Sequence, residues 1–175
     1  MIVSNINKKN LLLAYLFLLT NLVFSQDVEF KNSNFKEDKQ GLKLAKVNLA
    51  IADDFREKGV QKILAMQDAA VIFNQAIFKY QKAQNFNPNN AELNYKIGSS
   101  LLFTNQKEEA YSYLKKAKEL NADLPSDFLF YYAMALQLNG EYIQAIKQFK
   151  KFATTKRKVY ELYEVFVKKY IKECQ

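Results

Sequence analysis

The stretch from Ala91 to Leu124 reads AELNYKIGSSLLFTNQKEEAYSYLKKAKELNADL, and its small and large residues decide the fold. The small residues Gly98 and Ala110 allow two antiparallel helices to approach closely. Large apolar residues, Ile97, Leu101 and Leu114 among them, fill the space between those helices. The stretch therefore predicts a tightly packed helix pair.

The same pattern recurs on both sides of this stretch at a nearly fixed period. Ala76 lies 34 residues before Ala110, and Tyr80 lies 34 residues before Leu114. Downstream, Ala145 lies 35 residues after Ala110. Three units in register satisfy the minimum for a stable stack of helix pairs. A helical bundle with chance periodicity is the alternative interpretation.

The middle unit resembles the tetratricopeptide repeat, whose first helix reads W-x2-L-G-x2-Y and whose second helix places a small residue four before a large one. Only the tryptophan position departs, because it carries Asn94. The resemblance implies an all-α helical-hairpin solenoid of three repeats with a C-terminal capping helix. We expect this repeat domain over residues 42–175, with repeats at about 42–90, 91–124 and 126–159 and the capping helix at about 157–174.

The first unit is longer than the other two. Its first helix is expected to stop at Gly59, a good helix terminator. The spacing from Gly59 to Ala76 exceeds the matching spacing from Gly140 to Ala145 by 12 residues. This difference predicts a helical insertion near 60–72, in which the second helix begins early and projects beyond the hairpin. The apolar side of that insertion either forms a surface for a partner or for self-association, or folds back onto the first helix.

Residues 1–25 are typical of a secretory signal peptide. Lys8 and Lys9 precede the apolar run Leu11–Phe24, and cleavage would leave Gln26 as the first residue. The run would span about 21 Å as a helix, against a hydrocarbon core of about 30 Å. We therefore predict an exported chain, and an uncleaved membrane anchor is the alternative.

The polar stretch 26–41 has no sustained hydrophobic period and predicts a flexible leader. The formal net charge of the chain is +8, and it falls to +6 without the signal peptide, which holds two lysines and no acidic residue. Anionic lipid or an acidic partner would suit this excess, but lysines scattered along helices favour a solvated surface. Nucleic acid is not expected as a partner of an exported chain.

The composition excludes most catalytic chemistry. The chain has no His and one Cys, which removes His-dependent catalytic triads and His-containing zinc sites. The sequence contains no glycine-rich phosphate loop and no nucleophile paired with a base. We expect no enzyme, no catalytic residue, no cofactor and no metal. Cys174 is interpreted as a helix residue that faces its neighbours, with a reactive or disulfide-forming thiol as the alternative.

The first helices of a hairpin stack line its concave side, and their residues directed away from the second helices form a groove. Clamps for a C-terminal carboxylate in tetratricopeptide proteins use Lys, Asn and Arg there, a set that this chain does not match. An amphipathic helix or an extended peptide fits the aromatic and apolar groove better. The alternative is that these side chains pack against neighbouring helices. The candidate partner-binding residues are Glu92, Tyr95, Ser99, Leu102, Asp127, Phe130, Met134 and Gln137.

Four short motifs carry a second resemblance: NAELNYKIG at 90–98, YAMALQLN at 132–139, EYIQAI at 141–146 and YIKEC at 170–174. They resemble the N-terminal repeat segment of exported, outer-membrane-associated proteins of the Bacteroidetes type. In that family a WD40-like (PD40) propeller and a C-terminal OmpA-like peptidoglycan-binding domain follow the repeats. Some members, the PorE-like proteins, serve type IX secretion and gliding. Neither downstream domain is in this sequence, so peptidoglycan binding is not implied.

The sequence thus predicts a non-enzymatic protein–protein scaffold of the cell envelope, periplasmic and associated with the outer membrane. Its expected partner is a protein or peptide held on the concave groove, and a role in type IX secretion or gliding follows from the resemblance. The alternative is a protein attached to the membrane surface by its uncleaved N-terminal hydrophobic segment and its basic surface.

Overall fold

The computed structural model describes residues 26–120, 123–154 and 157–175, so the predicted signal peptide at 1–25 lies outside the described residues. Within these ranges the chain forms seven α-helices and no strand, which confirms the all-α class. None of the helices in these ranges is long and apolar enough to cross a membrane.

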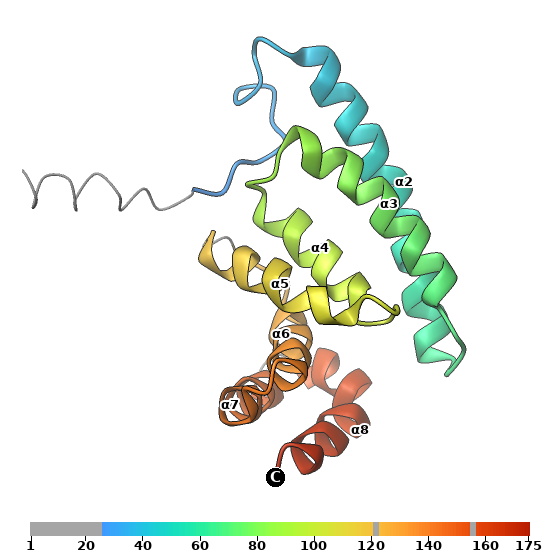
Figure 1. Ribbon diagram of the computed structural model, residues 1–175, viewed down its shortest axis with the longest axis vertical. Coiled ribbons are helices and arrows are strands. Elements are labelled where there is room, and N and C mark those ends of the chain that lie inside the picture. The colour runs from blue at the N-terminus through green and yellow to red at the C-terminus, as the bar shows by residue number, and fades with distance from the viewer. Residues whose placement is uncertain (1–25, 121–122, 155–156) are drawn as a thin grey trace, which may run out of the picture.

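Consecutive helices pack in pairs, α2 with α3, α4 with α5 and α6 with α7, and α8 packs on α7. Contacts of α3 with α4 and of α5 with α6 join one pair to the next. Figure 1 shows the pairs following one another from α2 and α3 to α6, α7 and α8. The helices are α2 (Lys39–Leu64), α3 (Ala70–Phe86), α4 (Ala91–Leu101), α5 (Ala110–Glu119), α6 (Phe128–Leu138), α7 (Tyr142–Ala153) and α8 (Arg157–Glu173), with a 3-10 turn at Lys107–Glu109 before α5.

Small residues set the close approach of α4 and α5. A Cβ atom added to Gly98 would lie 2.6 Å from Cγ of Leu114, so only glycine fits there without movement. Ala110, on the facing helix, is fully buried, as are the matching Ala76 and Ala145 of the other pairs. The predicted role of these small residues in helix contact is confirmed.

The prediction that the first helix stops at Gly59 is wrong. Helix α2 continues through this residue to Leu64, and α3 begins only at Ala70. A Cβ atom at Gly59 would lie 2.8 Å from the ring of Phe73, so the glycine serves the packing of two helices instead of ending one. Most of the extra residues of the first unit therefore lengthen the first helix instead of starting the second helix early.

The segment before α2 is not the flexible leader that its composition predicts. The backbone N–H of Val28 donates to the carbonyl of Asn89 at 2.8 Å, and the amide of Asn87 donates to the carbonyl of Val28 at 2.6 Å. The N–H of Ala91 donates to the carboxylate of Asp27 at 2.7 Å, which places a negative charge at the start of α4. Two phenylalanine rings of the segment also pack at the end of α3.

Helix α6 is the centre of the C-terminal half, because nearly all of its residues are buried. A helix that is apolar all round requires neighbours on every side. Helix α8 supplies one of them: the ring centroid of Tyr163 lies 4.6 Å from that of Phe130, and the Tyr170 ring stacks at 5.8 Å on Phe149. Val167 of α8 is fully buried against the same cluster. Helix α8 thus covers the last helix pair.

Candidate binding site

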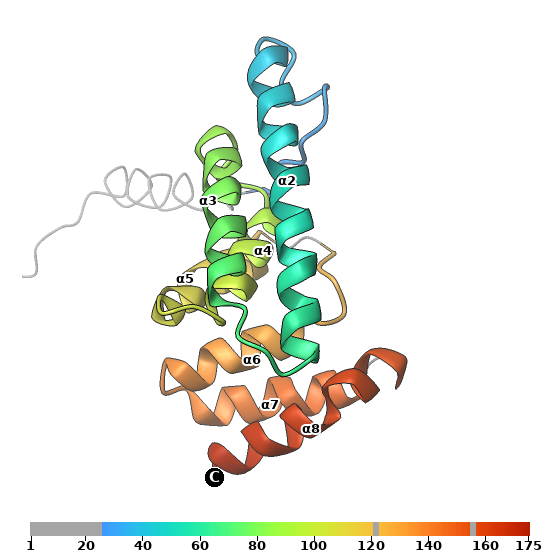
Figure 2. The same cartoon turned by 90° about the vertical axis from the view of Figure 1, so that its right-hand side faces the viewer.

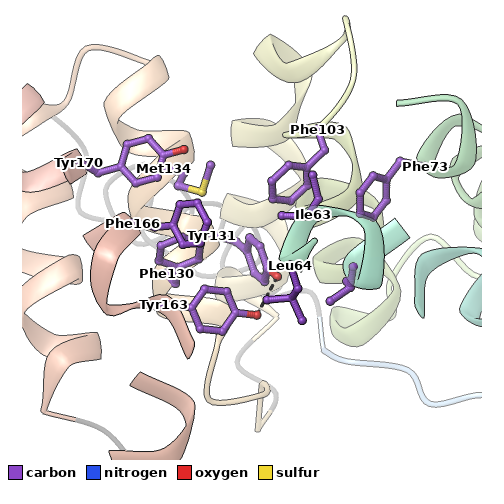
Figure 3. Close-up of a pocket in the computed structure, with 11 residues that line it drawn as sticks. Ile63, Leu64, Phe73, Phe103, Phe130, Tyr131, Met134, Tyr163, Phe166 and Tyr170 are labelled. Atoms are coloured by element: carbon purple, nitrogen blue, oxygen red, sulfur yellow. Dashed lines mark hydrogen bonds between the residues drawn. The ribbon is translucent and has the colours of Figure 1, made fainter. Parts of the chain in front are cut away.

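A small apolar cavity of about 40 Å³ lies where the C-terminal end of α2 meets α6 and α8. Figure 2 shows the end of α2 directed toward these two helices, and Figure 3 shows the side chains around the cavity. One water needs roughly 10–15 Å³ by the same measure, so the space exceeds that of a single water. Its walls include Val60, Ile63, Leu64, Tyr131, Met134 and Phe166.

The continuation of α2 beyond Gly59 builds one wall of this cavity. It adds a further turn that carries Ile63 and Leu64, and in Figure 3 both lie opposite the α8 side chains. The hydroxyls of Tyr131 and Tyr163 lie 3.1 Å apart and hydrogen-bond to each other. They therefore leave little hydrogen-bonding capacity for a group inside the cavity. Because its walls are apolar and aromatic, the cavity suits an apolar side chain better than water.

A half-buried cation, Arg56, lies one turn before the cavity on α2. Nη2 of Arg56 donates to the hydroxyl of Tyr95 at 2.9 Å and to the hydroxyl of Ser99 at 3.4 Å. The Tyr95 hydroxyl in turn donates to the carboxylate of Asp127 at 2.8 Å. The guanidinium also lies over the Tyr95 ring, 5.3 Å from its centroid. This network links α2, α4 and the start of α6.

The charge of Arg56 is only indirectly balanced. Its Nε is buried and has no hydrogen-bond partner, and within the described residues Nη1 bonds to nothing and no carboxylate forms a salt bridge with it. Burial alone would lower the pKa of the guanidinium, but the surrounding groups, including the carboxylate of Asp127, offset burial and the pKa is raised. The side chain therefore remains cationic.

A second polar cluster, nearer the surface, joins α2, α3 and α4. The hydroxyl of Tyr80 donates to the carboxylate of Asp53 at 2.6 Å. Nζ of Lys96 lies 2.9 Å from Asp53 and 2.9 Å from Glu92. Glu92, one of the predicted groove residues, is therefore an exposed partner of a lysine on its own helix.

Several predicted groove residues are buried in the core and do not form an open surface. Tyr95 and Phe130 are 2% and 3% exposed, and Ser99 is also buried. The Tyr95 hydroxyl is occupied by Arg56 and Asp127, while aromatic rings of α7 and α8 surround Phe130. For these residues the structure shows the alternative interpretation, packing against neighbouring helices.

The other predicted groove residues lie nearer open space. Met134 lines the cavity described above and also a shallower hollow between α4, α6 and α8. Leu102 and Gln137 line the same hollow, and the amide of Gln137 donates to Glu173 of α8 at 3.4 Å. Asp127 is half-buried in the Arg56 network. The predicted set is thus divided among a buried network, the cavity and the hollow.

Sequence reasoning missed Arg56 and the contribution of α8 to the cavity. The composition could have indicated Arg56, because the chain holds only two arginines among 26 cationic residues. Arginine is better suited than lysine to buried ion pairs, so an arginine in a lysine-rich chain is a candidate for such a role. The aromatic residues of α8 were interpreted only as a cover for the last helix pair. The sequence shows the apolar residues after Gly59, but it does not show that they pack against α6.

No group of three or more His, Cys, Asp or Glu residues in the described part of the chain could hold a metal ion. Burial, assisted by Glu173, raises the pKa of the half-buried Cys174 thiol, which disfavours the reactive thiolate.

Comparison with protein-family models, curated proteins and solved structures finds no match to this chain. The fold and the site therefore define only its class: an all-α protein of packed helix pairs with an apolar cavity near a half-buried arginine.

Proposed function

We propose that the chain is a non-enzymatic scaffold of the cell envelope that binds a segment of another protein at the cavity between α2, α6 and α8. One observation carries the proposal: the cavity is apolar, and Leu64, one of the residues that line it, is 42% exposed. A concave apolar pocket with few polar groups is the usual form of a site that anchors one side chain of a ligand.

The finer architecture that we propose is a solenoid of three tetratricopeptide-like repeats. The period of 34–35 residues, the buried Ala76, Ala110 and Ala145 and the three helix pairs support it. Helix α8 then has the role of a capping helix, since it covers the last pair. An envelope location and a role in type IX secretion or gliding rest on the predicted signal peptide and on the sequence resemblance.

Replacing Leu64 by lysine is expected to abolish partner capture, because the charge would stand at the opening of the apolar cavity. The measurement compares proteins retained from an envelope extract by the wild-type chain and by the Leu64→Lys chain. The fold should persist, because Leu64 is well exposed and exposed substitutions usually change stability by no more than about 0.5 kcal/mol.

The matched control is Val71→Lys on α3, which adds the same charge at a residue that is 70% exposed and does not line the cavity. It should retain the same proteins as the wild type. Equal capture by the Leu64→Lys chain, or no captured protein with any of the three chains, would contradict the proposal.

The second candidate, attachment to a membrane surface, is favoured by the outer face of α2. Leu44, Val47 and Ile51 are exposed on that face, at 64%, 49% and 38%, and Lys43 and Lys46 flank them. Such a face suits the interface of an anionic bilayer. If the scaffold proposal is right, the chain beginning at Gln26 should remain in solution when it is centrifuged with anionic lipid vesicles. If the chain instead sediments with the vesicles, and Val47→Glu abolishes this, the result would favour attachment to a membrane surface.

A further inference from the structure

Arg56 uses little of its capacity to donate hydrogen bonds. A guanidinium has five N–H donors, and here only Nη2 is bonded, to two hydroxyls. Hydroxyls are neutral, so they satisfy the donors without neutralising the charge. A largely buried cation is costly unless a hydrogen-bonded anion accompanies it. Its position is therefore prepared for a carboxylate that the described residues do not supply.

The nearest acidic side chain of the network cannot take that role directly. Asp127 is held through the hydroxyl of Tyr95, which separates it from the guanidinium. Asp53, on the same helix as Arg56, accepts from Tyr80 and Lys96 and is committed to that cluster. Both carboxylates are thus fixed by other partners.

The apolar cavity begins one helical turn further along α2. Val60 follows Arg56 by four residues, on the same face of the helix, and lines the cavity. One turn corresponds to about 5.4 Å along the helix axis. Tyr131 joins the two places from the other side, because it lines the cavity and its ring centroid lies 6.2 Å from that of Tyr95.

We infer that Arg56 and the cavity together recognise an acidic side chain that lies close in sequence to an apolar side chain on one partner segment. This inference rests on the proposed scaffold function and defines its ligand. The carboxylate would bond to the unused Nη1 of Arg56, because Nε is enclosed by the protein and the planar guanidinium suits a carboxylate. The apolar side chain would enter the cavity. The separation of one helical turn corresponds to two residues of an extended segment or four of a helical one.

The experiment selects peptides from a displayed random library with the chain beginning at Gln26 as the target. Enriched peptides are expected to share Asp or Glu within about four positions of Leu, Ile, Met or Phe. The best peptide is then synthesised with its acid and with the matching amide, Asn or Gln. The amide form should bind at least about tenfold more weakly, because it loses a charge-assisted pair.

The peptide pair leaves the protein unchanged, so it does not depend on whether Arg56 variants fold. Arg56→Gln should abolish the difference between acid and amide, whereas Lys58→Gln, at an exposed residue of the same helix, should retain it. The chain has only two arginines, so the Nε–H resonance of Arg56 can be identified by its loss in Arg56→Lys. It should shift on addition of the acid peptide and not of the amide.

Each failure has a distinct meaning. Equal binding of acid and amide peptides would overturn the inference about Arg56 and leave the scaffold proposal standing, provided that Leu64→Lys still weakens both. Selected peptides that bind the Leu64→Lys chain as well as the wild type would overturn the inference and the proposed site together. A selection without any enriched binder would do the same.

Discussion

Replacing Phe130 by alanine is expected to lower the free energy of unfolding by about 3–5 kcal/mol. The ring is 3% exposed and contacts the rings of Phe149, Phe152 and Tyr163. Removing it creates a cavity at the centre of an aromatic cluster, and the lost transfer and packing energies add. Because a domain usually has only about 5–15 kcal/mol of stability, the loss is a large part of the total.

The measurement is urea unfolding followed by far-UV circular dichroism, with the wild type as reference. The transition midpoint should fall while the slope stays unchanged, if the chain remains two-state. Leu138→Ala is the control, because this leucine lies on the same helix but is 46% exposed. It should cost no more than about 0.5 kcal/mol. A Phe130→Ala chain as stable as the control would show that the rings of α7 and α8 do not enclose Phe130 in solution.

This prediction separates two roles that the sequence alone could not separate. A large apolar residue on the first helix of a pair fits both a groove that binds a partner and a core that binds another helix. The pattern around Phe130 is the same in both cases. The positions of α7 and α8, which supply Phe152 and Tyr163, show that the ring is already covered.

The parts of the fold that could be predicted are those set by local spacing. The requirement for small residues at Gly98 and Ala110 follows from contacts between helices adjacent in sequence, and period and residue size reveal it directly. The all-α class follows from the same periodicity. These features depend on residues about a dozen positions apart, within reach of a pattern in one stretch of sequence.

The features that were missed depend on contacts distant in sequence. Glycine is a residue type that often ends a helix, so Gly59 predicts a helix end. Only its contact with the ring of Phe73 on the next helix explains why it lies inside α2. The segment that holds Asp27 and Val28 has the composition of a free leader, but it is ordered by contacts with the turn before α4 and with the end of α3. Arg56 likewise donates a hydrogen bond to Tyr95, which lies 39 residues away in the sequence. No local pattern encodes such pairings.

Raising the pH above about 10 is expected to unfold the chain steeply, because three buried tyrosines resist ionisation in the folded state. Burial chiefly raises the pKa of Tyr80, Tyr95 and Tyr131 above the ordinary value. Hydrogen bonds add to the shift: Tyr80 donates to Asp53, Tyr95 donates to Asp127, and the Tyr131 hydroxyl bonds to that of Tyr163. The neutral phenol is thus the form that the fold accommodates.

The sign of the effect follows from proton binding. Above pH 10 the unfolded chain loses three protons that the folded chain keeps, so the free energy of unfolding falls as pH rises. Each such tyrosine contributes about 1.4 kcal/mol per pH unit, and three contribute about 4 kcal/mol. Domains usually have a free energy of unfolding of about 5–15 kcal/mol. A chain at the lower end of that range would therefore unfold about one pH unit above the ordinary tyrosine pKa.

Circular dichroism and tyrosinate absorbance, recorded together against pH, test this expectation. The buried tyrosines should ionise only as the helices unfold, in one shared transition. Tyr131→Phe should reduce the pH dependence of stability by about one third, since one of three titrating groups is lost, whereas Leu138→Ala, at a residue that is 46% exposed and does not ionise, should leave it unchanged. Complete ionisation of the tyrosines while the helices persist would mean that solvent reaches Tyr95, and the network around Arg56 would then be open to water.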